Sequence, residues 1–392
     1  MKQEKIVSKI NAKSGTSENL AVAKKAKFDE FYTPQEDIKN ELNHWKHKFM
    51  GKRIICPCDW DVLSDEDVYS VTIEFEEENL TPTYTVNKVK RIKVQHFEYA
   101  MSFLESENSS PVIVEEVITG QQAKDLLRER VTCNFIKYLL GIANQCKIKS
   151  ITASGYDGLT GRGIKFQEVD YSQYDLCLTN PPFSLYKEFM DCMMTEYARR
   201  DRSTDPFDFI ILAPLTNRQC PNVAEPLTER KVFLGYNRDT HILFRNPDEK
   251  ATHDKKKPVD VDWITTFDDA QQEVDKYLLS TGVDYEVYKD DYSIMNGMTL
   301  KDGTHPIRIK DKRATPENYT GWMFASIGVL NKLSYKYYDW YITSLKGYYN
   351  KRHPEQNPFS HAVTDRMYNG GFHGVLFRRK PDVPYEELTE ET

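Results

Sequence analysis

The residues best suited to chemistry are Asn180, Pro181, Pro182 and Phe183, which directly follow a short apolar run at 175–179. Neither proline can donate to a strand ladder, so the pair ends the strand and stiffens the turn. The side-chain oxygen of Asn180 and the carbonyl of Pro181 then become two fixed acceptors beside the ring of Phe183. Such a set matches a planar group bearing an NH2, because the acceptors take both amino hydrogens while the ring stacks on the group.

The surroundings of this turn favour a functional site over a simple loop. A bare Asn-Pro-Pro tripeptide usually marks only a loop that begins with asparagine. Here an apolar run precedes it and an amphipathic helix follows, to Arg199. Ligands of open α/β sheets sit beyond the carboxyl ends of such strands. We therefore interpret residues 180–183 as a catalytic turn.

A first helix is predicted to begin at Thr33. Thr33 serves as the N-cap, Pro34 occupies the first turn and Glu36 completes a capping box. Gly51 closes the helix. One apolar stripe runs along it and consists of Ile38, Leu42, Trp45 and Phe49.

Short apolar strands alternate with helices in the rest of the chain. A further helix is predicted at 134–146. The predicted strands are 53–58, 148–153, 175–179, 207–213 and 231–236. This alternation is typical of a parallel sheet covered on both faces. The fold class is therefore α/β, with a doubly wound mixed sheet, an inserted α+β segment at 62–130 and a C-terminal extension.

Composition restricts the class of protein. The 392 residues are 39% hydrophobic and 29% charged, which excludes collagen-like, low-complexity and wholly disordered chains. No apolar run approaches the roughly 18 residues of a membrane span, and we expect no secretory signal and no membrane partner. The seven cysteines include no CxxC pair, so a reducing, cytoplasmic location without a metal site is expected.

Several motifs in order resemble the EcoRI-type family of adenine-specific DNA methyltransferases. They are DEFYTP at 29–34, CPCDWD at 56–61, TNPPFSLYKEF at 179–189, FDFIILAPLTN at 207–217, KVFLGY at 231–236, VDWITTF at 261–267 and YNGGFHGVLFRRK at 368–380. The resemblance implies a Rossmann-like class I methyltransferase that uses S-adenosylmethionine (S-adenosyl-L-methionine). It implies methyl transfer to the exocyclic N6 of an adenine in double-stranded DNA, in restriction-modification or by an orphan phage enzyme. We expect a flipped-out adenine because the base must leave the helix to reach the turn, and we assign no general base because the sulfonium is already activated.

The resemblance also implies a set of cofactor-binding residues. The aromatic-Thr-Pro segment lines the methionine end, an acidic strand end faces the amino-acid part, and later residues meet the ribose and the adenine. The implied residues are Phe31, Tyr32, Thr33, Asp59, Asp61, Ser154, Asp170 and Tyr171. Simpler alternatives are a helix cap for Thr33, a solvated turn acid for Asp59 and a Ser-Gly turn for Ser154.

The chain departs from the family pattern at two places. The family's acidic strand runs almost directly into a segment like RVTCNF at 130–135, whereas here residues 62–130 intervene. The family's aromatic-Thr-Asn element lacks its asparagine in residues 263–266. Trp263 is either an aromatic wall for the target base or, more commonly for a tryptophan at a strand end, a core side chain.

Cationic segments are candidates for phosphate contacts. Residues 301–353 carry ten Lys and Arg against four acids, interleaved with tyrosines, as on many nucleic-acid surfaces. The alternative is a solvated basic face over a tyrosine-rich core. The candidate DNA contacts are Asn217, Arg218, Lys255, Lys256, Lys257, Arg313, Lys346, Lys351 and Arg352.

The net charge of −7 is concentrated in one segment. Residues 62–130 hold fourteen acids and seven Lys and Arg. The net charge of this segment, −7, therefore equals the net charge of the whole chain. We predict that this acidic insertion lies away from DNA and offers a surface to a cognate restriction endonuclease or another protein. The predicted domains are a basic arm at 1–27, a catalytic domain at 28–61 plus 131–268, the insertion, and a target-recognition region at 269–392 of an expected monomer.

Two other functions stay open. The first is methylation of another planar amine, in a protein glutamine or an RNA base, since related tetrapeptides serve enzymes of those kinds. The second is a DNA-binding relative whose cofactor site has decayed. The cationic C-terminal third and the full motif order favour DNA, and the intact catalytic turn argues against decay.

Overall fold

The structure is a computed structural model and divides by its internal contacts into two compact units. The N-terminal unit is Met1–Phe207 with His241–Val259, and the C-terminal unit is Asp208–Thr240 with Asp260–Thr392. The described residues are 33–59, 68–75, 82–90, 112–118, 133–157, 162–238, 240–244, 257–276, 284–310, 315–316, 318–359 and 374–382. Within these segments, no helix is both long and apolar enough to cross a membrane. The predicted domain boundaries stay predictions.

The first helix lies close to its predicted position. It consists of α3 (Gln35–Leu42) and the 3-10 helix η1 (Asn43–Lys48), and Gly51 follows with a φ of +66°. Glycine adopts this left-handed conformation without the clash of a Cβ atom. All four residues of the predicted apolar stripe are fully buried: Ile38, Leu42, Trp45 and Phe49. The stripe therefore anchors the helix to the core of the N-terminal unit, as predicted.

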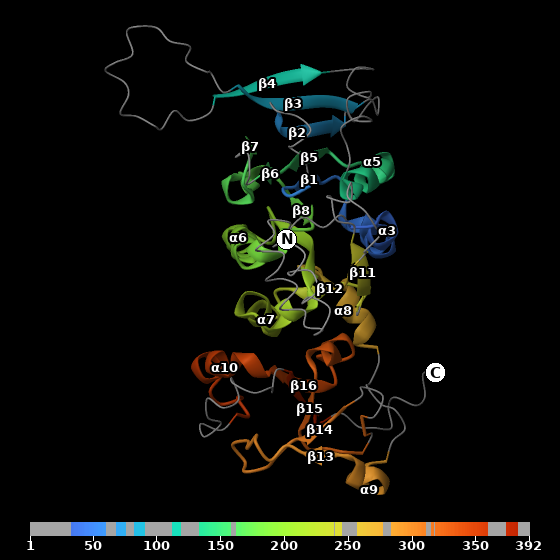
Figure 1. Cartoon of the computed structure of the whole chain (residues 1–392), viewed down its shortest axis with the longest axis vertical. Helices are drawn as coiled ribbons and strands as arrows, with labels where there is room; N and C mark the ends of the chain where they lie inside the picture. Colours follow the sequence, from blue (N-terminus) through green and yellow to red (C-terminus); the bar gives the residue numbers. More distant parts are fainter. Residues whose placement is uncertain are drawn as a thin grey trace, which may run out of the picture. The chain divides into compact units, whose positions relative to one another are not determined.

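Three short parallel strands form the centre of the N-terminal unit. In order they are β8 (Leu176–Thr179), β1 (Arg53–Cys56) and β5 (Ser150–Ser154). Figure 1 shows α6 (Tyr186–Arg199) on one side of these strands and α3 with α5 (Asn134–Cys146) on the other. The strands predicted at 53–58, 148–153 and 175–179 and the helix predicted at 134–146 are confirmed. Because the strands are parallel, the residues after β1, β5 and β8 lie at one edge of the sheet.

The described part of the acidic insertion consists of strands that continue this sheet. β2 (Val68–Phe75) pairs antiparallel with β5, and β3 (Pro82–Lys90) and β4 (Val112–Ile118) follow it outward. Figure 1 shows these strands beyond β5. The edge of β5 is thereby covered, which protects its backbone groups from pairing with another chain. The placement of the insertion relative to DNA stays a prediction.

Two sets of strands organise the C-terminal unit. β9 (Asp208–Pro214) is buried along its whole length and pairs antiparallel with β12 (Lys257–Thr265), which pairs antiparallel with β10 (Phe233–Leu234). The strands predicted at 207–213 and 231–236 are therefore present, although both pair antiparallel with β12. A separate five-stranded sheet has the order β13-β14-β15-β17-β16. Its members are β13 (Ser293–Ile294), β14 (Ile307–Arg308), β15 (Met323–Ala325), β16 (Tyr338–Ile342) and β17 (Val375–Arg379).

The remaining elements are short. The helices are α7 (Pro221–Thr228), α8 (Asp269–Val274), α9 (Tyr285–Tyr288) and α10 (Lys346–Arg352). The remaining strands are β6 (Tyr156–Asp157), β7 (Arg162–Gly163) and β11 (Thr240–Phe244). Together with the sheets above, they confirm a mixed α/β protein.

Candidate functional site

The catalytic turn follows β8 directly. The strand ends at Thr179, Pro182 has an extended ψ of 122°, and the 3-10 helix η5 (Phe183–Leu185) leads into α6. The Leu185 amide donates to the Pro182 carbonyl at 3.0 Å, which closes the turn. Phe183 is buried, with 7% of its surface exposed, so only a small part of its side chain faces solvent. The strand–turn–helix context expected of residues 180–183 is present.

Thr33 connects the start of the first helix to this turn. Asn180 Nδ2 donates to Thr33 Oγ1 at 3.3 Å, and Asn134 Nδ2 donates to the Thr33 carbonyl at 2.8 Å. The predicted capping role is wrong, because Pro34 holds the N-cap position and no side chain caps α3. The Thr33 hydroxyl accepts a hydrogen bond from Asn180 instead. Because one end of the Asn180 amide is held by Thr33, the side-chain oxygen at its other end has a defined direction.

Asp59 lies where three elements meet. Its amide donates to the Ser154 carbonyl at 3.0 Å, at the end of β5. Its carboxylate accepts hydrogen bonds from Thr179 Oγ1 at 2.5 Å and from Cys133 Sγ at 3.3 Å, at the end of β8 and the start of α5. Removal from water raises the pKa of Asp59 to about 7, although both hydrogen bonds act in the opposite direction. Among the described residues, no lysine or arginine forms an ion pair with this carboxylate.

The other predicted cofactor residues have different surroundings. Ser154 ends β5 with 1% exposure, and its hydroxyl has no hydrogen-bond partner among the described residues. Asp170 is exposed and accepts hydrogen bonds from Ser172, which lower the pKa of its carboxyl. Tyr171 is buried, and its hydroxyl donates to the Phe166 carbonyl at 2.9 Å. Tyr171 is thus bound into the core, whereas Thr33, Asp59 and Ser154 are linked to the catalytic edge.

Some predicted residues lie outside the described part of the chain, and some contributors were missed. Phe31, Tyr32 and Asp61 lie outside the described residues. Thr179, Cys133 and Asn134 were not predicted, although their side chains hold Asp59 and Thr33. Their positions at a strand end and a helix start are the signal that sequence reasoning had available. Only the folded chain reveals the bonds themselves.

Arg218 corrects one prediction of a DNA contact. It is 1% exposed, and its guanidinium pairs with both carboxylate oxygens of Asp262 and with Asn331 Oδ1. A side chain committed to these buried partners is not available to a phosphate. Trp263, next to Asp262 on β12, is also 1% exposed, which agrees with the core alternative. Arg218 therefore fastens the 3-10 helix η6 (Leu215–Gln219) to β12.

The remaining candidate DNA contacts have mixed placements. Asn217 in η6 is partly exposed, and Lys351 and Arg352 are exposed at the end of α10. Lys257 begins β12 and Lys346 begins α10. Three further candidates lie outside the described residues: Lys255, Lys256 and Arg313. The assignment of DNA contacts stays a prediction for all of these residues.

Fold and site together define a mixed α/β protein whose polar side chains are hydrogen-bonded to one another at the carboxyl ends of parallel strands. Residues 19–119 match a family model described as "Adenine-specific methyltransferase EcoRI". The matched interval contains most of the predicted insertion, whose strands also continue the sheet.

A curated relative gives the same result. Over 225 residues the chain is 26% identical to "Type II methyltransferase M.EcoRI" of Escherichia coli, which is 57% of each protein. The chain thus matches just over half the length of that relative. No solved structure matches the chain significantly. The predicted resemblance to the EcoRI-type family of adenine-specific DNA methyltransferases is confirmed by these two comparisons.

Proposed function

We propose that this chain is a Rossmann-like class I DNA methyltransferase of a restriction-modification pair or an orphan modification enzyme. It transfers a methyl group from S-adenosylmethionine to N6 of an adenine turned out of double-stranded DNA. The observation that carries the proposal is the Asn-Pro-Pro-Phe turn after β8, with Asn180 bonded to Thr33 and with Thr179 bonded to Asp59. The similarity to a type II methyltransferase supports the same activity.

Residues at the carboxyl ends of β1 and β5 fit the cofactor. Asp59 is a half-buried residue whose carboxylate has no cationic partner among the described residues, and the ammonium of a methionine moiety supplies one. Ser154 has a buried hydroxyl without a partner in the same part of the chain, which suits a ribose hydroxyl. When bound, S-adenosylmethionine supplies a methyl group on a sulfonium that is already activated.

The catalytic turn acts on the adenine amino group. This nitrogen is a weak nucleophile because its lone pair is delocalised into the ring. Asn180 Oδ1 and the Pro181 carbonyl accept its two hydrogens, which favours a pyramidal nitrogen with a directed lone pair. Thr33 holds the Asn180 amide in the required orientation. Positioning of this kind is worth roughly 7 kcal/mol or more, so no general base is assigned and the released proton passes to water.

Replacement of Asn180 tests the proposal. Asn180→Ala removes one acceptor, so transfer of a labelled methyl group to duplex DNA is expected to vanish while calorimetry still detects cofactor binding. Asn144→Ala, at an exposed position of α5, is the matched control and keeps full transfer. Normal turnover by Asn180→Ala contradicts the proposal. Transfer to RNA or protein with none to DNA favours the other planar amines instead.

A further inference from the structure

The C-terminal unit contains a cavity of about 180 Å³ beside β16 and the end of α7. A cavity of roughly 150 Å³ holds one benzene ring, so this one has room for a single planar ring. Most of the lining consists of aromatic side chains together with one arginine and one lysine. The six lining residues that carry the argument are Arg230, Tyr335, Asp339, Trp340, Tyr341 and Lys380. Arg230 is exposed, so the cavity is accessible from solvent.

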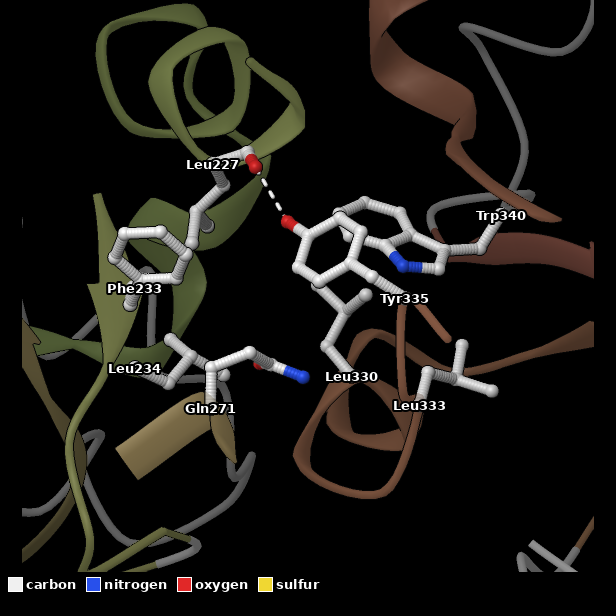
Figure 2. A pocket seen from close by; sticks show the side chains of 8 residues that line it. All are labelled: Leu227, Phe233, Leu234, Gln271, Leu330, Leu333, Tyr335 and Trp340. Atoms are coloured by element: carbon white, nitrogen blue, oxygen red, sulfur yellow. Dashed lines mark hydrogen bonds between the residues drawn. The ribbon is translucent and has the colours of Figure 1, made fainter. Parts of the chain in front are cut away.

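Ring contacts and hydrogen bonds hold the aromatic side chains of this cavity in place. The rings of Tyr335 and Trp340 lie 5.0 Å apart, and the Tyr335 hydroxyl donates to the Leu227 carbonyl. Figure 2 shows both rings where they also line a small cavity of about 10 Å³, which is at most large enough for one water. The Tyr341 hydroxyl donates to the Gln356 carbonyl at 2.8 Å. Both tyrosine hydroxyls donate to backbone carbonyls of the same unit, so a ligand would contact the ring surfaces.

The charges of the lining favour an anion. The Arg230 guanidinium lies 4.2 Å from the centre of the Tyr335 ring, and Lys380 Nζ donates to the Tyr335 carbonyl at 2.7 Å. Asp339 is the one acid among the lining residues, and it already accepts a hydrogen bond from Arg378 at 3.3 Å. Two cations next to flat rings match a nucleotide, which combines an anionic phosphate with planar and sugar surfaces.

The backbone of Arg230 is unusual for an arginine. Its φ is +56°, and it lies just after the end of α7. Two backbone hydrogen bonds close the helix there. Lys231 N donates to the Pro226 carbonyl at 2.9 Å, and Arg230 N donates to the Leu227 carbonyl at 3.2 Å. This pattern is a Schellman motif, whose left-handed residue is usually glycine. Strained residues of this kind cluster at ligand sites. Arg230 thus adopts a backbone conformation that glycine would adopt without strain, and its side chain lines the cavity.

We propose that this cavity binds one nucleotide of the substrate DNA strand. Arg230 and Lys380 contact the phosphate, and the rings of Tyr335 and Tyr341 contact the sugar or base. The inference rests on the proposed function, since the ligand is part of its substrate. The site adds an anchor point for DNA in the C-terminal unit, in addition to the catalytic turn of the N-terminal unit.

Variants of the two cations test the inference by direct DNA binding. The probe is a fluorescent duplex, and the measured quantity is the dependence of log affinity on log salt concentration. Each of Arg230→Gly and Lys380→Gln is expected to reduce the slope by about 0.9, and the double variant by about 1.8. Arg230→Gly is informative because glycine fits the observed φ, so its melting temperature stays at or above that of the wild type. Lys289→Gln, at an exposed cation that lines neither cavity, leaves the slope unchanged.

The possible outcomes separate this inference from the proposed function. Normal DNA binding with unchanged slopes in both cation variants overturns the nucleotide site alone. Failure of the wild-type chain to bind duplex DNA overturns the proposed function as well. To test the ring contacts, deoxycytidine monophosphate and inorganic phosphate compete with the duplex. Stronger competition by the nucleotide, lost in Arg230→Gly, supports them, and equal competition by the two contradicts them.

Discussion

The raised pKa of Asp59 predicts a specific pH dependence of stability. The ordinary pKa of this carboxyl is 3.8, and in the folded chain it is about 7. Below pH 3.8 the group is neutral in both states. Between the two values the unfolded chain loses its proton while the folded chain keeps it, so stability falls as pH rises and stays low above pH 7. Asp59→Asn removes this dependence, because the amide does not titrate.

The magnitude follows from the difference between the two pKa values. One pKa unit corresponds to about 1.4 kcal/mol, so the shift from 3.8 to about 7 sets an upper bound of about 4 kcal/mol. Because Asp59 is partly exposed, water reduces the effect below that bound. We expect Asp59→Asn to gain roughly 2–4 kcal/mol over the wild type between pH 4 and pH 8.

Urea unfolding at a series of pH values measures this gain. The free energy of unfolding of each protein is compared at pH 4, 5, 6, 7 and 8 without cofactor. Asp170→Asn is the control of opposite sign. Hydrogen bonds from Ser172 lower the pKa of Asp170, so its ionised carboxylate stabilises the folded state at pH values above the ordinary pKa of the group, and the variant is expected to be less stable than the wild type. A difference between Asp59→Asn and wild type that does not change with pH refutes the account of Asp59.

Three further predictions concern single side chains. Thr33→Val removes the hydrogen bond from Asn180, so kcat is expected to fall about tenfold, which is the effect of one hydrogen bond. Calorimetry should show unchanged cofactor affinity, and an unchanged kcat contradicts the positioning role of Thr33. Phe183→Ala removes ring surface for the flipped base, so the KM for DNA should rise at least tenfold, and an unchanged KM argues against stacking. Arg218→Met leaves Asp262 buried without its partner and should destabilise by about 3–5 kcal/mol in urea unfolding. Adding Asp262→Leu should recover much of that loss, and no recovery would contradict the ion-pair explanation.

Local sequence patterns predicted the elements whose neighbours are close in the chain. The stripe from Ile38 to Phe49 and the turn after β8 follow from spacing and from proline chemistry, which act within a few residues. The partners of Asp59 are different, because Thr179 is 120 residues away and Cys133 is 74 residues away. Such contacts depend on which strands become neighbours, and one sequence does not specify this.

The same reasoning explains the errors at Thr33 and Arg218. Thr33 satisfies a local capping rule, but the fold brings Asn180 to its hydroxyl from 147 residues away. Arg218 resembles a loop cation until β12 places Asp262 beside it. In both residues a distant partner overrides the local preference. The antiparallel pairing of β10 and β12 likewise depends on a register that apolar runs do not encode.

The most direct test of the central claim is to map modified adenines in the DNA of cells that express this chain. Single-molecule sequencing of that DNA is expected to show N6-methylated adenine at one recurrent sequence. Cells expressing Asn180→Ala at the same level are expected to show none. Absence of modified adenine with the wild-type chain, under conditions where the purified protein binds S-adenosylmethionine, would contradict the claim that this turn methylates DNA.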